Sequence, residues 1–250
     1  DKTDGEAGLE KAMDELCRRV DEAIAQDNNL IILSDRGVDE SKVPIPSLLA
    51  VAGVHHHLVR NETRTRVGLA IESGEPREVH HFCLLLGYGA QAINPYMAFE
   101  SLNDMVREGM LDEYSYEEAE ERYVYGAIKG VVKVMAKMGI STIKSYRGAQ
   151  IFESMGLNQE VIDKYFTWTT TQVKGMGLEG IAREALERHA HAFPDIETNG
   201  STLGVGGHNQ WRKEGEHHLF NPKSIHLLQR AVRTDDYEVY KQYAEQINDQ

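Results

Sequence analysis

Cysteine is scarce in this sequence, and its scarcity excludes several kinds of site. Only Cys17 and Cys83 occur among the 250 residues. Neither has a second cysteine nearby, so the ligand spacings of zinc and iron–sulfur motifs are absent, and two thiols cannot form the disulfide framework of a small secreted protein. We expect both thiols to be buried and inert. A disulfide between them is the alternative, which a reducing compartment disfavours.

Long apolar runs and an excess of positive charge are also lacking. No run approaches the roughly 20 apolar residues that cross a bilayer, and the first ten residues are too polar for a signal peptide. With 27 Lys and Arg against 40 Asp and Glu, the formal net charge is −13. Nucleic-acid binding depends on clustered basic residues that neutralise phosphates. The sequence therefore predicts a cytoplasmic protein with no membrane and no nucleic-acid partner.

Common catalytic motifs are missing too, because the chain has no GxSxG elbow, no GxxxxGK[ST] loop and no HExxH pair. One GxGxxG does occur, at Gly175–Gly180, after the β-branched run Thr167–Val173. A dinucleotide site also needs a second strand that ends near an acidic residue about 20 positions on. Asp195 has that offset but follows a helix with no strand between. We interpret the motif as a glycine-rich turn, with nucleotide binding as the less favoured alternative.

The eleven histidines raise a metal hypothesis, since most are adjacent or nearly so. Neighbours on a helix point about 100° apart, whereas a two-histidine helical site needs spacing i, i+3 or i, i+4. No cluster has that spacing, so we expect no metal site, with a meeting of His55 and His80 between packed helices as the alternative. The clusters are His55–His57, His80–His81, His189 with His191, and His217–His218.

Alternating short apolar runs and periodic segments indicate the fold of the first part. The order β-α-β-α-β favours parallel strands with right-handed crossovers, as in doubly wound sheets and (β/α)8 barrels. Because Leu30–Leu33 is continuously apolar, we expect that strand to be covered on both faces. The expected elements are a helix over Leu9–Ile24, strands over Leu30–Leu33, Arg66–Ile71 and Gln91–Asn94, and helices over Pro46–Leu58 and Arg77–Leu86.

The remainder is expected to be mainly helical. A long helix over Tyr123–Met138 ends at Gly139, shorter helices follow without clear new strands, and the loop Pro194–Gly207 is a candidate linker. We therefore divide the chain into an α/β region over residues 1–110, a helical continuation over 111–193, and a linker with helices over 194–250. The shorter helices are expected at Ile151–Met155, Glu160–Tyr165, Leu178–His189, Ile225–Val232 and Tyr237–Ile247.

Two groups of polar residues are candidate sites. In a parallel sheet, ligands lie beyond the carboxyl ends of the strands, where Asp35, Arg36, Ser73 and Gly74 are expected. The flanking Glu72 and Glu75 would repel the phosphate of FMN, so we expect no flavin at these strand ends. The second group stands between two helices and either binds an anion or forms a buried interdomain contact. Its members are Lys144, Tyr146, Arg147 and Gln150.

Many segments resemble one enzyme family in register along nearly the whole chain. The match is more specific than any short motif above, and the family is the glutamate synthase large subunit. The segments are Ile31–Gly37, Pro44–Val51, Val54–Leu58, Glu78–Phe82, Leu85–Ala90, Asn94–Tyr96, Lys137–Ser141, Ser145–Phe152, Gly180–Ala185, and Trp211–Arg212 through Asn221–Pro222.

The resemblance implies part of an ammonia-assimilating oxidoreductase that makes two glutamates from glutamine and 2-oxoglutarate. In that family a cysteine at the N-terminus hydrolyses glutamine, ammonia passes through a tunnel, and a barrel with FMN and a 3Fe-4S cluster completes the reaction with electrons from reduced pyridine nucleotide or ferredoxin. We expect this chain to cover the later central domain and the connection into the FMN-binding domain. None of the family's catalytic, cofactor or metal residues has a matching position here.

The expected role is therefore structural: the segment links the glutaminase and FMN domains and is inactive alone. Those domains are its expected partners, together with a small subunit or a second copy. A standalone module that binds a small anionic metabolite is the alternative. The chain departs from the family at Thr167–Thr169 and Gln172, where a glycine and an arginine are usual. Tryptophan does not reach positive φ cheaply, so we expect that turn to be rebuilt or to lack the family's local interaction.

Overall fold

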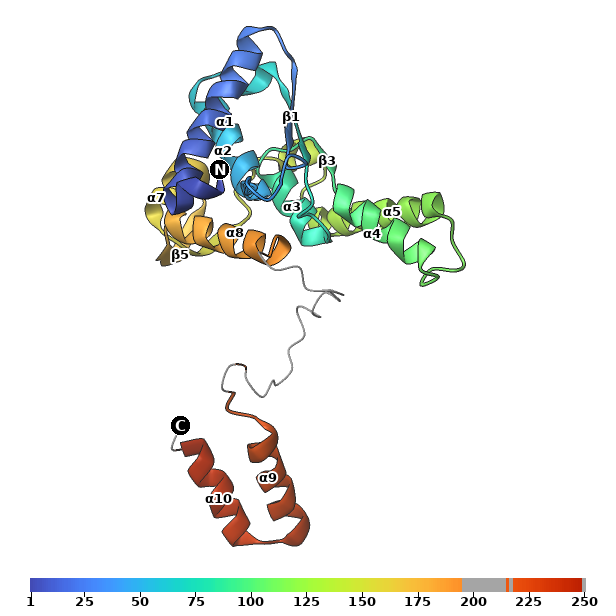
Figure 1. The fold of residues 1–250 in the computed structure, drawn as a ribbon, viewed down its shortest axis with the longest axis vertical. Helices are drawn as coiled ribbons and strands as arrows, with labels where there is room; N and C mark the ends of the chain where they lie inside the picture. Colours follow the sequence, from blue (N-terminus) through green and yellow to red (C-terminus); the bar gives the residue numbers. More distant parts are fainter. Residues whose placement is uncertain (195–214, 216–217, 249–250) are drawn as a thin grey trace. The chain divides into compact units, whose positions relative to one another are not determined.

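The computed structural model describes residues 1–194, 215 and 218–248 (Figure 1). The chain divides into two compact units, Asp1–Asp195 and Ile196–Gln250. The second unit contains helix α9 (Pro222–Thr234) and helix α10 (Tyr237–Asn248), as the sequence predicts, and the two helices pack against each other. Within the expected linker, only Pro194 belongs to the described part of the chain.

The first unit is built on a three-stranded parallel sheet. Its order is β1 (Leu30–Ser34), β2 (Gly68–Glu72) and β3 (Ala92–Asn94). Helix α2 (Ser47–Arg60) connects the first two strands and helix α3 (Val79–Gly87) the second and third. The α/β fold and the alternating order are thus confirmed, and the carboxyl ends of all three strands meet at one edge of the sheet.

Only one face of β1 is covered, so the expectation of burial on both faces is wrong for the part of the chain described. Ile31 and Leu33 are buried in the core with α2, whereas Leu30 and Ile32 remain 56% and 60% exposed. Parallel strands are normally covered on both faces, because helices usually pack on each side. The continuous apolar run therefore marks a strand whose second face has no cover within the described residues.

Helix α1 (Gly8–Ala25) and helix α7 (Gln159–Tyr165) pack against α2. Gly53 of α2 makes this packing close, because a Cβ there would lie 2.3 Å from the Cε atom of Met13 and 3.2 Å from the ring of Tyr165. Two core clusters share this region: one joins α1 and α2 to the sheet, and the other joins α1 and α2 to α7.

A second, two-stranded parallel sheet is present that the sequence pattern does not predict. It pairs β4 (Glu153–Leu157) with β5 (Thr170–Met176), and α7 connects them. The expected helix over Ile151–Met155 is therefore wrong, because three of its residues belong to β4. Helix α8 (Leu178–Ala192) then follows as predicted. Strand β4 carries Gly156 at positive φ and has an irregular register with β5. Its sequence therefore lacks the alternation of apolar and polar residues that predicts a strand.

Helices α4 (Tyr96–Arg107) and α5 (Tyr116–Lys137) lie side by side and extend away from the sheet (Figure 1). The sequence pattern does not predict α4, and α5 begins seven residues before the expected Tyr123. Ser115 explains the early start, since its side chain accepts from the backbone of Glu118 while Glu118 caps Ser115 in return. Gly139 follows the helix at φ 71, as the sequence predicts.

Three short helices complete the first unit: η1 (Lys2–Ala7), η2 (Arg64–Arg66) and α6 (Ile143–Tyr146). The described strands form two small parallel sheets and no closed barrel. In the same part of the chain, every helix is too short or too polar to cross a membrane.

Candidate functional site

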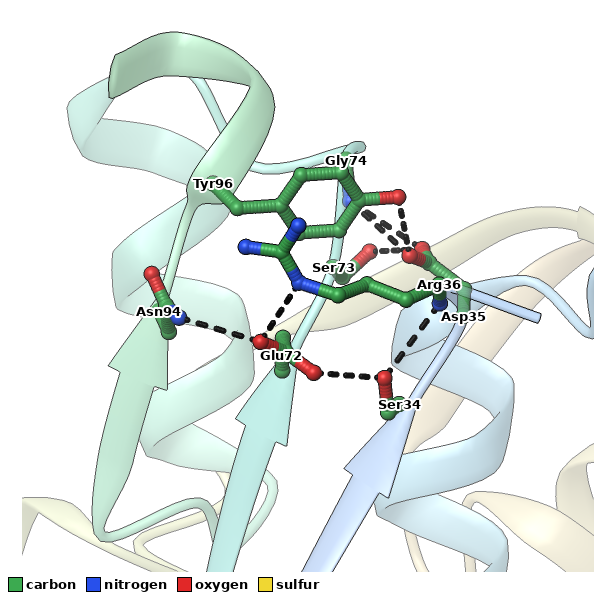
Figure 2. Close-up of polar contacts among 8 residues, drawn as sticks. All are labelled: Ser34, Asp35, Arg36, Glu72, Ser73, Gly74, Asn94 and Tyr96. Carbon is green, nitrogen blue, oxygen red and sulfur yellow. Dashed lines mark hydrogen bonds and ion pairs between the residues drawn. The ribbon is translucent and has the colours of Figure 1, made fainter. Parts of the chain in front are cut away.

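The carboxyl ends of β1, β2 and β3 converge on one group of polar side chains, which we call the strand-end network (Figure 2). It contains all four residues predicted at the strand ends. The flanking Glu72 belongs to it as well, and so do Ser34, Asn94 and Tyr96. The members are Ser34, Asp35, Arg36, Glu72, Ser73, Gly74, Asn94 and Tyr96.

Asp35 is the centre of one half of the network. Its carboxylate accepts hydrogen bonds from the Ser73 hydroxyl at 2.6 Å, the Tyr96 phenol at 2.7 Å and the Gly74 backbone N–H at 3.1 Å. Ser73 is fully buried. Hydrogen bonds to a charged acceptor are stronger than neutral ones, and three of them compensate for partial burial of the carboxylate. Asp35 thus ties the end of β1 to β2 and to the start of α4.

Tyr96 serves this half as a fixed proton donor. Burial, together with the hydrogen bond to the negative Asp35, raises the pKa of the phenol to about 12. A phenol with that pKa keeps its proton at neutral pH. The phenol O–H is also already engaged, because it donates a hydrogen bond to Asp35. Tyr96 is therefore unsuited to act as a general base or nucleophile in this arrangement.

Glu72 is the centre of the other half. It accepts from the Ser34 hydroxyl at 2.6 Å, from Arg36 Nε at 2.7 Å and from the Asn94 amide at 3.3 Å. The Ser34 hydrogen bond and then the Arg36 guanidinium lower the pKa of Glu72. Arg36 also lies over the ring of Tyr96, 4.1 Å from its centroid, and this cation–π contact joins the two halves.

A neighbouring carboxylate closes the start of helix α2. Glu75 accepts from the backbone N–H of Ser47 at 2.7 Å, while its own N–H donates to the Ser73 hydroxyl at 3.1 Å. The positive end of a helix dipole favours such a carboxylate. The N–H groups of Ser47 and Gly74 are thus both engaged by side chains of the chain itself.

These strand ends do not fit the phosphate of FMN. A phosphate site needs free backbone N–H groups or cations that face the ligand. Here the N–H of Gly74 is bonded to Asp35, that of Ser47 is bonded to Glu75, and Arg36 is paired with Glu72. Three carboxylates would in addition repel a dianion. The arrangement has the properties of a structural clamp between strands and helices.

The second predicted group is dispersed. Tyr146 is fully buried beside Cys83 in the cluster that joins α3 to α5, and burial raises the pKa of its phenol. Lys144 and Gln150 are exposed, and Arg147 is half-buried. The adjacent Gly148 N–H donates to the Gly87 carbonyl at 2.8 Å, so this segment is anchored to the end of α3.

The glycines of the GxGxxG motif have packing roles. Strand β5 begins within the β-branched run and extends into the motif, since it includes Gly175. A Cβ on Gly175 would lie 2.5 Å from the carbonyl oxygen of Gly156 in the paired strand, and one on Gly177 would lie 2.6 Å from the Glu179 carboxylate. That carboxylate stands where a dinucleotide site would receive phosphate. Asp195 lies outside the described residues.

The histidines make separate contacts. His57 bonds to Asp21 at 2.8 Å, His55 accepts from Arg64 Nε at 3.0 Å, and His80 packs against Phe152. His189 is buried and bonds to the Asp39 carbonyl at 2.7 Å. No group of three potential ligands that could hold a metal occurs among the residues whose positions are described, and His217 is not one of these.

The two cysteines are free, and they are not bonded to each other. Cys83 is buried, and Cys17, on α1, is half-buried. Burial raises the pKa of both thiols, that of Cys17 to about 11. Since the thiolate is the reactive form, the raised pKa keeps both thiols protonated at neutral pH. The predicted burial is confirmed for Cys83, whereas Cys17 is only partly buried.

Comparison with known proteins assigns this arrangement to a family. The chain matches the family described as the glutamate synthase central domain over residues 2–158. The chain belongs to this family. It is 50% identical over 242 residues to the glutamate synthase [NADPH] large chain of Bacillus subtilis (strain 168). It is 42% identical over 245 residues to the glutamate synthase [NADH] of Schizosaccharomyces pombe, and 37% identical over 251 to the ferredoxin-dependent enzyme of Pyropia yezoensis.

These matches cover nearly all of this chain but a small part of each relative. The Bacillus subtilis alignment includes 97% of this chain and 16% of the relative, and the Schizosaccharomyces pombe alignment 97% and 12%. For the Pyropia yezoensis relative the shares are 96% and 16%. The chain is therefore a partial segment of a glutamate synthase large chain, and the resemblance drawn from its sequence is confirmed.

The turn at Trp168 keeps the backbone conformation that a glycine would adopt easily. Trp168 has φ 66, and its side chain is 79% exposed. The flanking residues hold it there, because Thr169 bonds to the Tyr88 phenol at 2.7 Å and Thr167 accepts from Arg60 at 3.2 Å. Positive φ at a large side chain is strained. The expectation that this turn is rebuilt, or lacks the family's local interaction, stays a prediction; in this chain Trp168 adopts positive φ.

Proposed function

We propose that this segment is the structural link between the glutaminase and FMN domains of a glutamate synthase that makes two glutamates from glutamine and 2-oxoglutarate. It holds the two sites at a fixed separation, so that ammonia passes between them, and it performs no chemical step itself. FMN and the 3Fe-4S cluster belong to other parts of the enzyme in this proposal. The compartment is the cytoplasm, in line with two free thiols.

The observation that carries the proposal is the closed strand-end network. In parallel α/β folds, catalytic groups gather at this edge of the sheet. Here the carboxylates of Asp35, Glu72 and Glu75 are all engaged by donors from the chain, and each bond fixes one strand or helix to another. Carboxylates that are engaged in this way hold the strands and helices in place.

The uncovered face of β1 also supports a place inside a larger enzyme. Leu30 and Ile32 point away from the core on a strand type that is usually covered on both faces. In the proposed enzyme, the glutaminase domain, the FMN domain or a further part of the large chain covers this face. A small subunit is an additional partner in the proposal.

Coupling of the two half-reactions tests the structural role. In the assembled enzyme that contains this segment, we expect Asp35→Asn to loosen the clamp and raise glutamine hydrolysis above glutamate formation from 2-oxoglutarate. Each half-reaction, measured alone with free ammonia or with glutamine, should retain its rate within about twofold. A loss of one half-reaction of 100-fold or more, with coupling intact, would identify Asp35 as a catalytic group and refute the proposal.

Ligand binding by the chain itself supplies a second measurement. Thermal-shift titrations with FMN, glutamine, glutamate and 2-oxoglutarate are expected to leave the melting temperature of the 250-residue chain unchanged, since a ligand stabilises only a native state that binds it. Saturable stabilisation by FMN would contradict the conclusion that the strand ends do not fit the phosphate of FMN. Saturable stabilisation by 2-oxoglutarate that Arg147→Gln abolishes would instead favour the anion-binding alternative.

One observation favours that alternative, in which the chain binds a small anion near Arg147. Burial lowers the pKa of His55 most, followed by His56 and then by the charges of Arg64 and Arg147. Burial also lowers the pKa of Arg64, and the charge of Arg147 lowers it further, so the two guanidinium groups lie near each other. Arg64 donates to the carbonyls of Val67 and Gly89, each at 2.8 Å, and to His55. Among the described residues, the guanidinium of Arg64 thus has neutral acceptors alone, and its positive charge adds to that of Arg147.

A further inference from the structure

A group of arginine and histidine side chains lies at the amino ends of β2 and β3, at the edge of the sheet opposite the strand-end network. Arg64, just before β2, donates from Nε to His55 Nδ1 at 3.0 Å and from Nη2 to the carbonyl of Gly89, just before β3, at 2.8 Å. Gly89 lies against the imidazole, because at φ 115 a Cβ there would lie 2.3 Å from Nδ1. His55, Arg64 and the nearby Arg147 form what we call the amino-end cluster.

The hydrogen bonds of this cluster determine which of its donors remain free. A guanidinium only donates, so His55 Nδ1 is the acceptor and the ring proton is on Nε2. This Nε2–H has no acceptor among the described residues. Arg64 has five N–H groups and uses three of them, for His55, Val67 and Gly89, which leaves two.

Arg147 adds a second guanidinium to the cluster. The N–H of the next residue, Gly148, donates at 2.8 Å to the carbonyl of Gly87, which is the last residue of α3 and stands two positions before the carbonyl that Arg64 reaches. Arg64 and Arg147 are both half-buried. The guanidinium of Arg147 has no hydrogen bond or ion pair within the described part of the chain.

The amino-end cluster has no carboxylate of its own in the described residues. Burial lowers the pKa of His55 and of Arg64 most, and the remaining causes are other histidine and arginine side chains. This is unusual in a chain with 40 Asp and Glu against 27 Lys and Arg, where Arg18, Arg36 and Arg107 each pair with a carboxylate. Half-buried like charges near each other destabilise the folded chain, and an anion from outside removes this cost.

We infer that His55, Arg64 and Arg147 bind a carboxylate side chain from another part of the glutamate synthase large chain. This inference rests on the structural-link proposal, in which neighbouring domains pack on this segment. The chain aligns with 16% of the Bacillus subtilis relative, so most of a large chain lies outside the segment. A guanidinium matches a carboxylate well, since two N–H groups can bond to its two oxygens. The Nε2–H of His55 supplies a further donor.

Hydrogen exchange over residues 143–152, measured by mass spectrometry, tests the contact in place. These amides should exchange at least about tenfold more slowly in the assembled enzyme than in the 250-residue chain alone. Arg147→Gln should remove most of that difference, because it deletes the partner of the carboxylate. In the chain alone, the same substitution should change exchange by less than about twofold, since no carboxylate is bound there.

Three further variants separate charge from general damage. Arg147→Lys keeps the positive charge and should retain at least about half of the protection in the enzyme, whereas Arg147→Glu repels the carboxylate and should retain none. The matched control is Arg107→Gln, because its guanidinium pairs with Asp104 inside α4. It should leave exchange over residues 143–152 unchanged in both settings. Far-ultraviolet circular dichroism checks that every variant remains folded.

Free anions distinguish a protein carboxylate from a small ligand. Thermal-shift titrations of the 250-residue chain with 2-oxoglutarate, glutamate and inorganic phosphate should give no saturable stabilisation if the carboxylate belongs to a neighbouring domain. Saturable stabilisation by any of the three that Arg147→Gln abolishes and Arg107→Gln retains would overturn the inference. The cluster would then be a site for a free anion.

Two results in the enzyme would also overturn the inference. Equal exchange over residues 143–152 in the enzyme and in the chain alone would show that no other part of the enzyme covers the cluster. An equal effect of Arg147→Gln in both settings would show that Arg147 stabilises only its own chain. Failure of the structural-link proposal is distinguishable, because it would appear in the coupling measurements with Asp35→Asn and not in exchange at Arg147.

Discussion

The phenol oxygen of Tyr96, at the start of α4, lies 2.7 Å from the carboxylate of Asp35, at the end of β1. This bond crosses over β2, the strand between them. We expect Tyr96→Phe to lower the free energy of unfolding by about 2 kcal/mol, the usual value for a hydrogen bond to a charged acceptor. Urea denaturation of the variant and the parent measures the difference.

Tyr125→Phe is the matched control for this prediction. Tyr125 also stands on a helix, but its ring is 60% exposed and contacts Lys129 through the ring face, which phenylalanine retains. Removal of the Tyr125 hydroxyl should change the free energy of unfolding by less than about 0.5 kcal/mol. Equal effects at both positions would show that the bond to Asp35 contributes nothing beyond ordinary solvation.

The strained turn at Trp168 predicts a stabilising substitution. At φ 66, a side chain with a Cβ costs roughly 1–2 kcal/mol that glycine does not. Part of the gain is offset because glycine also increases the entropy of the unfolded chain. Trp168→Gly should therefore raise the free energy of unfolding by about 1 kcal/mol. Trp168→Ala, which keeps a Cβ, should give no gain, and a similar gain from both would assign the effect to the exposed indole.

Two glycines predict opposite responses to alanine. At Gly175 the added methyl would lie 2.5 Å from the backbone oxygen of Gly156, so β4 and β5 must separate. We expect Gly175→Ala to destabilise the chain by about 2 kcal/mol. At Gly126, inside α5, nothing lies within 4 Å of the added methyl, and alanine is the better helix former. Gly126→Ala should stabilise by about 0.5–1 kcal/mol, and thermal denaturation of both variants tests the contrast.

Acid should destabilise the first unit through His55. Burial, with smaller effects from His56, Arg64 and Arg147, lowers the pKa of His55 from 6.5 to about 4. Between these values the unfolded chain binds a proton that the folded chain does not. The free energy of unfolding therefore falls as pH drops from 6.5 toward 4, by up to about 1.4 kcal/mol per pH unit from this group. Burial also lowers the pKa of His56 to about 4, so this residue contributes in the same direction.

His55→Gln separates this effect from general acid denaturation. Its amide oxygen can still accept from Arg64 Nε, but it does not titrate. Urea midpoints between pH 4 and 7 should show a shallower slope than in the parent chain. His191→Gln, at an exposed position on α8, should leave the slope unchanged. If the urea midpoints of all three proteins changed with pH by the same amount, His55 would not contribute to the acid sensitivity.

The first unit could be predicted where a local pattern decides the structure. The apolar run at β1 and the periodic residues of α2 required no tertiary information, because each segment is long enough or apolar enough to specify one conformation. The strand-end residues followed from one rule, that parallel strands end at a common edge. The rule found Asp35 and Ser73 but could not show that Tyr96 reaches across a strand to join them.

The misses have physical causes. Strand β4 contains glycine and serine and has an irregular register with β5. Its conformation therefore depends on its pairing with β5 and not on an alternation of apolar residues in its own sequence. The early start of α5 depends on a capping box at Ser115 within a charged stretch that lacks apolar periodicity. The contacts of the residues beside Trp168 fix its positive φ from outside the turn, and no single-sequence pattern contains them.

The exposed outer face of β1 has a consequence for how this polypeptide is made. In the described part of the sheet, β1 is an edge strand, and its five residues include neither proline nor a charged side chain to discourage pairing with another chain. An exposed edge of this kind favours pairing with strands of other chains, and hence cross-β aggregation, as long as no other part of the protein covers it. In the proposed enzyme we therefore expect β1 to stay open to such pairing until a neighbouring part of the enzyme covers it.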